Sequence, residues 1–338
     1  MKKWIGRVML AGLVVLAMAG CGKKEQAAET SGQSGDAKLK AVLVTSTSGL
    51  GDRSFLDSTW AGLQQAHDEL GVDIAVIEPK TNADYGSSMV AAVNGGANII
   101  FAFGNDFTDV LNEYAPKFPD VKFVGLNCNA KADNLKVAQT ADHEGSFLAG
   151  ALAGMMTKTG TVGAIGGVEG DNINRFLVGY EEGVKYVNPD ATVLKSYVGS
   201  FSDPAKGKEF AIQLMNQNAD VIYHVAGGTG EGVFEAIKMK DGIYAIGVDT
   251  DQDGIVEGRV LTSMVKNCNV IAYDSVKEAL DGKFTTGNQV FNLANGGVGL
   301  TEMKYTKDLI GEENLKKLDE IKAKIESGEI KVTDVLAQ

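Results

Sequence analysis

Short apolar runs alternate with helix-like patterns along most of the chain. The apolar runs lie at residues 40–46, 72–77, 98–103, 121–126, 136–141, 161–166, 191–198, 221–225, 244–248 and 259–265. Patterns typical of amphipathic helices lie at 54–70, 84–94, 106–116, 143–157, 174–187, 204–217, 233–237 and 268–281, with a charged helical tail at about 306–328. Strands separated by helices predict parallel sheets covered on both faces, and therefore an α/β fold.

Two helix ends carry residues that favour them locally. Gly71 follows the first helical pattern, where a glycine readily takes the left-handed conformation that ends a helix. Asp203 and Pro204 stand at the start of the pattern at 204–217, as an N-cap and a first helical residue. We therefore expect one helix to end at residue 71 and another to begin at residue 204.

The second half of the folded chain repeats the pattern of the first. Shifted by 122 residues, NGGANIIFAFGND (94–106) falls on NQNADVIYHVAGG (216–228), and VKFVGLN (121–127) on IYAIGVD (243–249). Shifted by one more, VAQTAD (137–142) meets VLTSMV (260–265). Few residues are identical, so independent runs of a common pattern stay an alternative. Two similarly wound lobes, doubly wound on parallel sheets, are the simpler interpretation.

This overlay also pairs polar residues that follow strands in the two halves. It places Asn105 and Asp106 opposite Gly227 and Gly228, Asn127 opposite Asp249, and Asp142 with His143 opposite Lys266. In open parallel sheets, ligands bind beyond the carboxyl ends of the strands. The pairs therefore predict a ligand cleft between two lobes, with one member of each pair on each side.

The glycine cluster at 227–232 resembles a dinucleotide turn only superficially. Its order is G-G-T-G-E-G, which differs from the G-x-G-x-x-G spacing, so we expect no nucleotide cofactor. Two interpretations stay open, a turn that lets a ligand approach backbone N–H groups and glycines needed only for a tight turn. The run Asp249 to Gly254 begins like a calcium loop, but Val260 replaces the bidentate glutamate and a strand leads into it. We expect Asp249 to face the cleft, and Asp251 and Asp253 to be turn residues.

Three aromatic residues stand where strands end or helices begin. Phe55 opens the first helical pattern, Phe176 opens the one at 174–187, and Phe201 follows the strand at 191–198. Aromatic side chains at a cleft edge stack on planar bases, with about 1–3 kcal/mol per stacked base. Phe176 also continues an apolar helical stripe, so a place in the core is an equal alternative for it. Carboxylates such as Asp106 and Asp249 suit the paired hydroxyls of a sugar.

No catalytic or metal-binding set is visible in the sequence. The three histidines are scattered, and G-x-S-x-G, H-E-x-x-H and C-x-x-C are all missing. We therefore expect a binding protein without a cofactor or a metal, not an enzyme.

The N-terminal residues read as a targeting segment. Lys2, Lys3 and Arg7 precede an apolar stretch, and small residues stand directly before Cys21, which resembles the lipobox of bacterial lipoproteins. This predicts a signal peptide at 1–20 and lipidation of Cys21, the alternative being an ordinary signal peptide that contains a cysteine. Residues 22–37 hold no large apolar side chain and predict a flexible tether to a membrane.

The charge of the chain argues against nucleic acid as a partner. The formal net charge is −12, and loss of the three basic residues in 1–20 takes it to −15. A surface this acidic lacks the basic patches that phosphates require. The two remaining cysteines, Cys128 and Cys268, make no disulfide framework, and we expect both to be buried.

A series of motifs resembles one family. They are GLGDRSFLDSTWAGL, EGSFLAGALAG (144–154), INRFLVGYEEGV (173–184), YVGSFSDPAKGKEFA (197–211), HVAGGTGEGVFEA (224–236), GVDTDQ (247–252) and LTSMVK (261–266). In this order they resemble the basic membrane protein family of substrate-binding lipoproteins, which includes purine nucleoside receptors of ABC importers. The resemblance covers residues 40–300. It implies a type I periplasmic-binding-protein fold with three crossovers, with lobe 1 at 38–142 plus about 267–290 and lobe 2 at 143–266 plus about 291–338.

The resemblance also implies roles for individual residues. The base would stack between Phe55 and either Phe176 or Phe201. Acids and a lysine would hold the ribose, here Asp106, Asp249 and Lys266, while Gly228 would offer its backbone. The further candidates at the cleft edge are Asp52, Asn105 and Asn127. Family members often carry an acid after the first strand, where this chain has Ser46 and Thr47, so the choice among guanosine, adenosine and inosine stays open.

The sequence therefore predicts a membrane-anchored extracytoplasmic receptor that closes over a purine nucleoside and passes it to an ABC permease. A sensor lipoprotein that binds another polar ligand and signals to a membrane partner is the main alternative. A nucleoside hydrolase is disfavoured, because no acid-base or metal set is visible.

Overall fold

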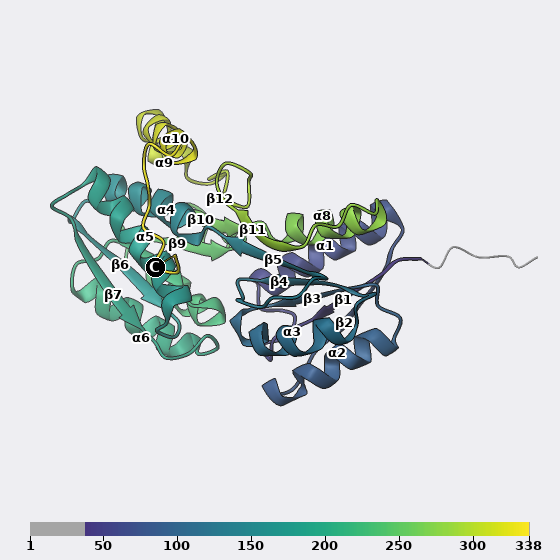
Figure 1. The fold of residues 1–338 in the computed structure, drawn as a ribbon. Coiled ribbons are helices and arrows are strands. Elements are labelled where there is room, and N and C mark those ends of the chain that lie inside the picture. The colour runs from purple at the N-terminus through teal and green to yellow at the C-terminus, as the bar shows by residue number, and fades with distance from the viewer. Residues whose placement is uncertain (1–37, 338) are drawn as a thin grey trace, which may run out of the picture. The chain divides into compact units, whose positions relative to one another are not determined.

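The structure, a computed structural model, describes residues 38–337, and the chain from Lys38 onward forms one compact unit. It contains two lobes, each built on a six-stranded sheet (Figure 1). The predicted signal peptide, Cys21 and the tether up to residue 37 lie outside the described residues.

Lobe 1 is built on a wholly parallel sheet in the order β11-β5-β4-β3-β1-β2. Its strands are β1 (Lys40–Val44), β2 (Asp73–Ile77), β3 (Ile99–Phe103), β4 (Lys122–Leu126), β5 (Leu135–Thr140) and β11 (Gly287–Phe291). One face carries α1 (Phe55–Leu70) and α8 (Cys268–Leu280), and the other carries α2 (Tyr85–Asn94) and α3 (Thr108–Tyr114) (Figure 1). Each face has its own buried apolar cluster.

Lobe 2 repeats this plan in the order β12-β10-β9-β8-β6-β7. Its strands are β6 (Thr161–Gly166), β7 (Thr192–Tyr197), β8 (Val221–Val225), β9 (Tyr244–Asp249), β10 (Val260–Lys266) and β12 (Val298–Leu300). Its helices are α4 (Asp142–Met156), α5 (Asp171–Val187), α6 (Pro204–Asn216), α7 (Glu231–Ile237), α9 (Lys307–Ile310) and α10 (Glu312–Glu326). The strand order matches lobe 1 position by position, so the predicted repeat is confirmed as a repeat of topology.

The chain passes between the sheets three times, as the resemblance implied. It crosses after β5, after β10, and between β11 and β12. The crossings lie side by side, because Ala141 N–H donates to the Phe291 carbonyl at 2.8 Å and Asn267 N–H donates to the Gly297 carbonyl at 3.0 Å. This bundle of connections is the hinge region.

Two strands, β11 and β12, were not predicted from the sequence pattern. β11 has the sequence GNQVF and is largely exposed, because it lies at the edge of its sheet with β5 as its neighbour. β12 is three residues long and pairs antiparallel with β10, so the second sheet is not wholly parallel as expected. Edge strands bury too little apolar surface to produce a continuous apolar run in the sequence.

The predicted helical tail is also divided, since Gly311 at φ +79° separates α9 from α10.

Several local predictions are confirmed. β8 is buried along its whole length, as a strand covered on both faces should be. Gly71 takes φ +71° and its N–H donates to the His67 carbonyl, while the Asp203 carboxylate accepts a hydrogen bond from the Lys206 N–H. Cys128 and Cys268 are buried free thiols.

Helices α4 and α5 approach each other closely because both carry glycines on the shared face. A Cβ atom at Gly150 would overlap the Tyr180 carbonyl oxygen, and one at Gly183 would overlap the Phe147 carbonyl oxygen. Both obstacles are backbone, which a rotamer change cannot move. The two helices can therefore pack at this distance only with glycine at these positions.

Gly183→Ala should lower the free energy of unfolding by about 1–3 kcal/mol, because a methyl group would be forced into a packed interface. Gly170→Ala is the control, since a Cβ atom there meets nothing within 4 Å and the backbone is extended at φ 170°. Urea unfolding of the two variants measures the difference. Equal losses in both would contradict this account of the α4–α5 packing.

Candidate ligand-binding site

One loop of lobe 1 reaches across to lobe 2. The Ser54 hydroxyl donates to the Asp249 carboxylate at 2.5 Å, and the Thr250 hydroxyl donates to the Arg53 carbonyl at 2.8 Å. Arg53 also pairs with Glu231 at 3.3 Å, although both side chains are largely or partly exposed and the pair contributes little stability. The start of α1 therefore lies against the carboxyl end of β9. The sequence predicted that these two segments lie on opposite sides of one ligand cleft.

Two carboxylates fix the shape of this loop. Asp52 accepts hydrogen bonds from the N–H groups of Ser54 at 2.9 Å, Leu56 at 3.2 Å and Asp57 at 3.2 Å. In return, Asp57 accepts from the N–H groups of Gly51 at 2.7 Å and Arg53 at 2.9 Å. Asp52 thus satisfies donors at the start of α1 that the helix itself leaves free. Its role in this structure is to hold Ser54 and Phe55 in place.

The environment of Asp52 is unusual for a carboxylate that caps a helix. Burial raises the pKa of Asp52 to about 6 and outweighs the backbone hydrogen bonds, which act in the opposite direction. The side chain therefore changes its charge at mildly acidic pH, whereas an aspartate in water does so near pH 4.

A buried ion pair lies beside Asp249. Lys266 Nζ is 3.6 Å from the Asp142 carboxylate, and the two side chains are 9% and 3% exposed. Burial by itself would lower the pKa of Lys266, but the charges of Asp142 and Asp249 outweigh it, so the pKa lies above its ordinary value. The ammonium therefore stays charged; it is paired with Asp142 at the crossover after β5 and is also stabilised by the charge of Asp249 at the end of β9.

Asn127 supports this ion pair from lobe 1. Its side-chain amide donates to Thr140 Oγ1 at 2.9 Å and to the Asp142 carboxylate at 3.3 Å, and its oxygen accepts from the Thr140 N–H at 2.9 Å. Both ends of the amide are used within the protein. Asn127 therefore orients Asp142 in this arrangement, which is a supporting role at the predicted site.

The equivalence of Asn127 and Asp249 extends to the backbone. Asn127 has φ +49° and Asp249 has φ +66°, a left-handed conformation that residues other than glycine adopt rarely. Each residue stands at the carboxyl end of the equivalent strand, β4 or β9. The turns after β3 and β8 are equivalent as well, since both are short 3₁₀ segments, Asn105–Phe107 and Gly227–Gly230.

The three aromatic residues differ in exposure. Phe176 is 4% exposed, belongs to the lobe 2 core and has its ring 5.3 Å below the Lys266 ammonium. Phe55 is half-buried at the first residue of α1. Phe201 is 44% exposed, and its ring lies on the backbone of Gly167 while its carbonyl lies beside Gly228. Phe201 and Phe55 are therefore the more accessible rings, and Phe176 supports the lysine.

The remaining candidates lie at the facing edge of lobe 1. Thr47 is exposed and its N–H donates to the Tyr85 hydroxyl at 3.2 Å, and Ser46 precedes it, half-buried. Asn105 and Asp106 are exposed in the turn after β3. The pKa of Tyr85 is raised mainly by burial, and the charge of Asp106 adds to this effect. These four residues follow the neighbouring strands β1 and β3, so they share one sheet edge.

The acidic turn after β9 differs in part from its prediction. Asp251 is exposed, but Asp253 is 2% exposed and accepts hydrogen bonds from Ser263 Oγ at 2.7 Å and Thr301 Oγ1 at 2.6 Å. Gln252 is also buried, and its side-chain oxygen accepts from the Val248 N–H at 2.9 Å. The turn is therefore anchored to β10 and to the segment after β12, which fixes Asp249 at its base.

Sequence patterns predicted no role for the residues that join the lobes, which are Arg53, Ser54, Glu231 and Thr250. The one feature of the sequence that could have indicated Ser54 is its position at a helix start, between two acids in the motif GDRSFLD. Cross-lobe contacts of this kind join residues about 180–200 positions apart, as Arg53 and Glu231 do, and local patterns carry no information about them.

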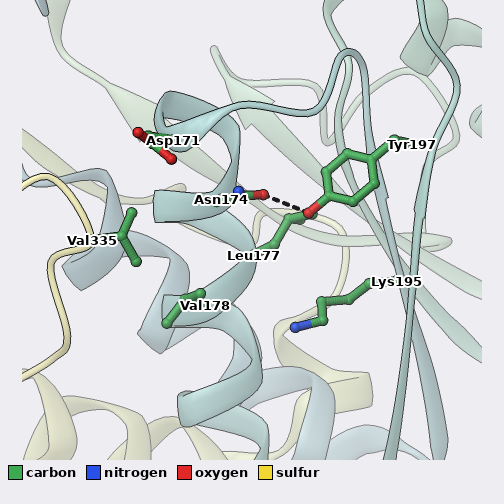
Figure 2. Close-up of a pocket in the computed structure, with 7 residues that line it drawn as sticks. All are labelled: Asp171, Asn174, Leu177, Val178, Lys195, Tyr197 and Val335. Carbon is green, nitrogen blue, oxygen red and sulfur yellow. Dashed lines mark hydrogen bonds between the residues drawn. The ribbon is translucent and has the colours of Figure 1, made fainter.

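A separate surface pocket of about 360 Å³ lies on lobe 2, between α5, β7 and the C-terminal segment (Figure 2). Tyr197 donates a hydrogen bond to the Asn174 side chain across it at 2.5 Å (Figure 2). None of the predicted site residues lines this pocket. In residues 38–337 no group of three potential ligands could hold a metal ion, and no helix is long and apolar enough to cross a membrane.

Comparison with known families shows which family the chain belongs to. Residues 39–335 match the family described as "ABC transporter substrate-binding protein PnrA-like", so the chain belongs to this family, which is the basic membrane protein family that its motifs resembled. Its members bind a small ligand on the extracytoplasmic side and deliver it to a permease, and they are not enzymes.

Particular relatives agree with this assignment. The chain is 36% identical to the "ABC transporter nucleoside-binding protein BmpA" of Lactococcus lactis, with 95% of this chain and 97% of that protein covered. It is 30% identical to "Basic membrane protein A" of Borreliella afzelii, with 89% and 94% covered. A solute-binding protein of an ABC transporter from Aeropyrum pernix superposes with a TM-score of 0.81 at 27% identity, with 88% of this chain and 93% of that one covered. The predicted type I periplasmic-binding-protein fold is confirmed.

The raised pKa of Asp52 predicts a specific pH dependence of stability. Because the folded protein holds this proton more tightly than the unfolded chain, the contribution is fully present below pH 3.8 and is lost as the pH rises through about 6. Relative to Asp52→Asn, the wild-type protein should lose about 1–3 kcal/mol of unfolding free energy between pH 4 and pH 7. Urea unfolding of both proteins at the two pH values tests this, and a pH-independent difference would contradict it.

Proposed function

We propose that this protein is a membrane-anchored receptor that binds a purine nucleoside between its two lobes for import by an ABC transporter. The observation that carries the proposal is the contact between Ser54 and Asp249, which brings the start of α1 to the end of β9 beside the Lys266 ammonium. A carboxylate and an ammonium thus lie next to the position of an aromatic residue, Phe55.

The base is proposed to stack between Phe55 of lobe 1 and Phe201 of lobe 2. Phe201 has the larger exposed surface, and its neighbour Gly228 has no side chain to obstruct the approach of a ligand to the backbone. Phe176 is the weaker candidate because the core already covers its ring. Stacking on aromatic rings accepts any planar base, so it contributes affinity more than selectivity.

The ribose is proposed to lie on Asp249, with Asp106 and Lys266 as further partners. A carboxylate accepts charge-assisted hydrogen bonds from neighbouring hydroxyl groups. The Ser54 hydroxyl already makes such a bond to Asp249, so a sugar hydroxyl would find an acceptor of the right kind at this place. Lys266 is held by Asp142 and stays charged, and it would donate to ring or hydroxyl oxygens.

Selectivity among the purines is proposed to come from Ser46 and Thr47. Hydroxyl groups both donate and accept hydrogen bonds, whereas an ionised acid only accepts. A hydroxyl pair therefore imposes a weaker preference between guanosine, adenosine and inosine than an acid would. Asp52, Asn105 and Asn127 are proposed as supporting residues that hold the loops around the ligand.

Attachment to the membrane is proposed to occur through a lipid on Cys21, with residues 22–37 as the tether. We also propose that lobe 1 comprises residues 38–142 and about 267–290, and lobe 2 residues 143–266 and about 291–338. The support for the ligand class comes from the relative of Lactococcus lactis that is named for nucleoside binding. The support for the anchor is the basic and apolar start of the chain with small residues before Cys21.

Calorimetric titration of residues 38–338 should show binding of at least one purine nucleoside, with weaker binding of the free base and of ribose. Neither the free base nor ribose alone would contact both the aromatic residues and the carboxylates. Absence of binding by every nucleoside would overturn the proposal, and binding of an unrelated polar ligand in its place would favour the sensor function.

Asp249→Ala should weaken nucleoside binding about 10- to 100-fold, equivalent to about 1.4–2.7 kcal/mol, and should leave binding of the free base nearly unchanged. The reason is that the proposed partner of Asp249 is the sugar. Asp251→Ala is the matched control, because it removes an exposed carboxylate two residues further along. Equal losses of nucleoside and base affinity would exclude a ribose contact for Asp249.

A further inference from the structure

The segment that follows α10 is fastened to α5 by charged groups. The Asp334 carboxylate accepts two hydrogen bonds from the Arg175 guanidinium, from Nε at 2.8 Å and from Nη2 at 2.5 Å. The Thr333 N–H donates to Glu182 at 3.0 Å, about two turns further along the helix. Val335 of the same segment lines the surface pocket together with Asp171 and Val178 of α5 (Figure 2).

The remaining terminal nitrogen of the Arg175 guanidinium, Nη1, contacts the hinge region. Nη1 donates to the carbonyl of Thr140, the last residue of β5, at 2.5 Å. Thr140 belongs to the sheet of lobe 1, whereas Arg175 belongs to lobe 2, so this bond joins the lobes at the first crossover. The guanidinium is planar with donors at fixed directions, and binding of two of them by Asp334 therefore aims the third at Thr140.

Thr140 connects this arrangement to the candidate ligand site. Its hydroxyl donates to the Asp142 carboxylate at 2.7 Å, and its N–H donates to Asn127 at 2.9 Å. Asp142 in turn pairs with Lys266 at 3.6 Å. A continuous series of polar contacts therefore runs from Asp334 through Arg175 and Thr140 to Lys266, which lies beside Asp249.

We propose that Arg175 and Asp334 are positioning residues for the ligand site, which hold the Thr140–Asp142–Lys266 cluster in its binding geometry. The proposal rests on the proposed function, because it assigns these residues to the site where a nucleoside is expected. The Arg175 side chain is 5% exposed and requires a counter-charge, which Asp334 supplies at 22% exposure.

The other charged groups near Arg175 do not replace Asp334. His143 faces the same cluster, and burial together with the charge of Arg175 lowers its pKa, so it is neutral at pH 7. Glu182 accepts from the Thr333 backbone, and Glu144 accepts from the Leu293 N–H at 3.1 Å. Asp334 makes both of the carboxylate hydrogen bonds that the guanidinium has among the described residues.

Asp334→Asn tests the proposal, with Glu182→Gln as the matched control. The control removes the charge from the other carboxylate that contacts the same segment but leaves the guanidinium fully paired. Asp334→Asn should weaken inosine binding about 5- to 20-fold, and the control should change it less than twofold. Amide hydrogen exchange of a peptide that covers residues 136–143, measured without ligand, should be about tenfold faster in Asp334→Asn only.

The exchange measurement separates this proposal from the nucleoside function. If the wild-type protein binds no nucleoside but exchange in 136–143 rises in Asp334→Asn alone, the ligand assignment fails and the positioning contact stands. If Asp334→Asn only lowers the melting temperature, with wild-type exchange in 136–143 and wild-type affinity, the positioning role is overturned.

A second variant covers a failure of Asp334→Asn to fold. Arg175→Lys keeps the positive charge beside Asp334 but lacks the fork that reaches Thr140 at the same time. It should fold and show the faster exchange in 136–143. Wild-type exchange in this variant would equally overturn the proposal.

Discussion

The buried ion pair between Asp142 and Lys266 is the interaction on which the arrangement of the two lobes depends. Asp142 begins α4 directly after the first crossover, and Lys266 ends β10 directly before the second. A charge that is 9% exposed is costly without a partner, so the ends of β5 and β10 must stay within ion-pair distance. Breaking the pair by removing one member would leave the other buried and unpaired.

Around this fixed point, the facing edges present more acids than bases. Lys266 pairs with Asp142, the charge of Asp249 also acts on it, and Asp52 and Asp106 add further carboxylates on the lobe 1 side. Such a set accepts hydrogen bonds from hydroxyl groups and repels phosphates. This favours an uncharged ligand with several hydroxyls over a phosphorylated one. Hinge closure in two-lobed binders of this kind requires contacts that both lobes share, which the Ser54–Asp249 hydrogen bond illustrates.

The sequence predicted the strands and helices that bury apolar surface, because burial on both faces leaves a continuous run such as the one in β8. It also predicted the pairing of Asn127 with Asp249, since a repeat preserves the order of strands. It could not predict β11, whose exposed edge has a polar composition. Nor could it assign Arg175, which in the sequence resembles any exposed arginine on an amphipathic helix. Its partners Thr140 and Asp334 are 35 and 159 residues away, and only the folded chain brings them together.

The position of the ligand is the central claim, and a crystal structure of the protein with inosine tests it most directly. We expect the base between Phe55 and Phe201, with a ribose hydroxyl within hydrogen-bond distance of the Asp249 carboxylate. Inosine found instead in the surface pocket beside Asp171 and Tyr197, or bound between the lobes without contact to Asp249, would contradict it.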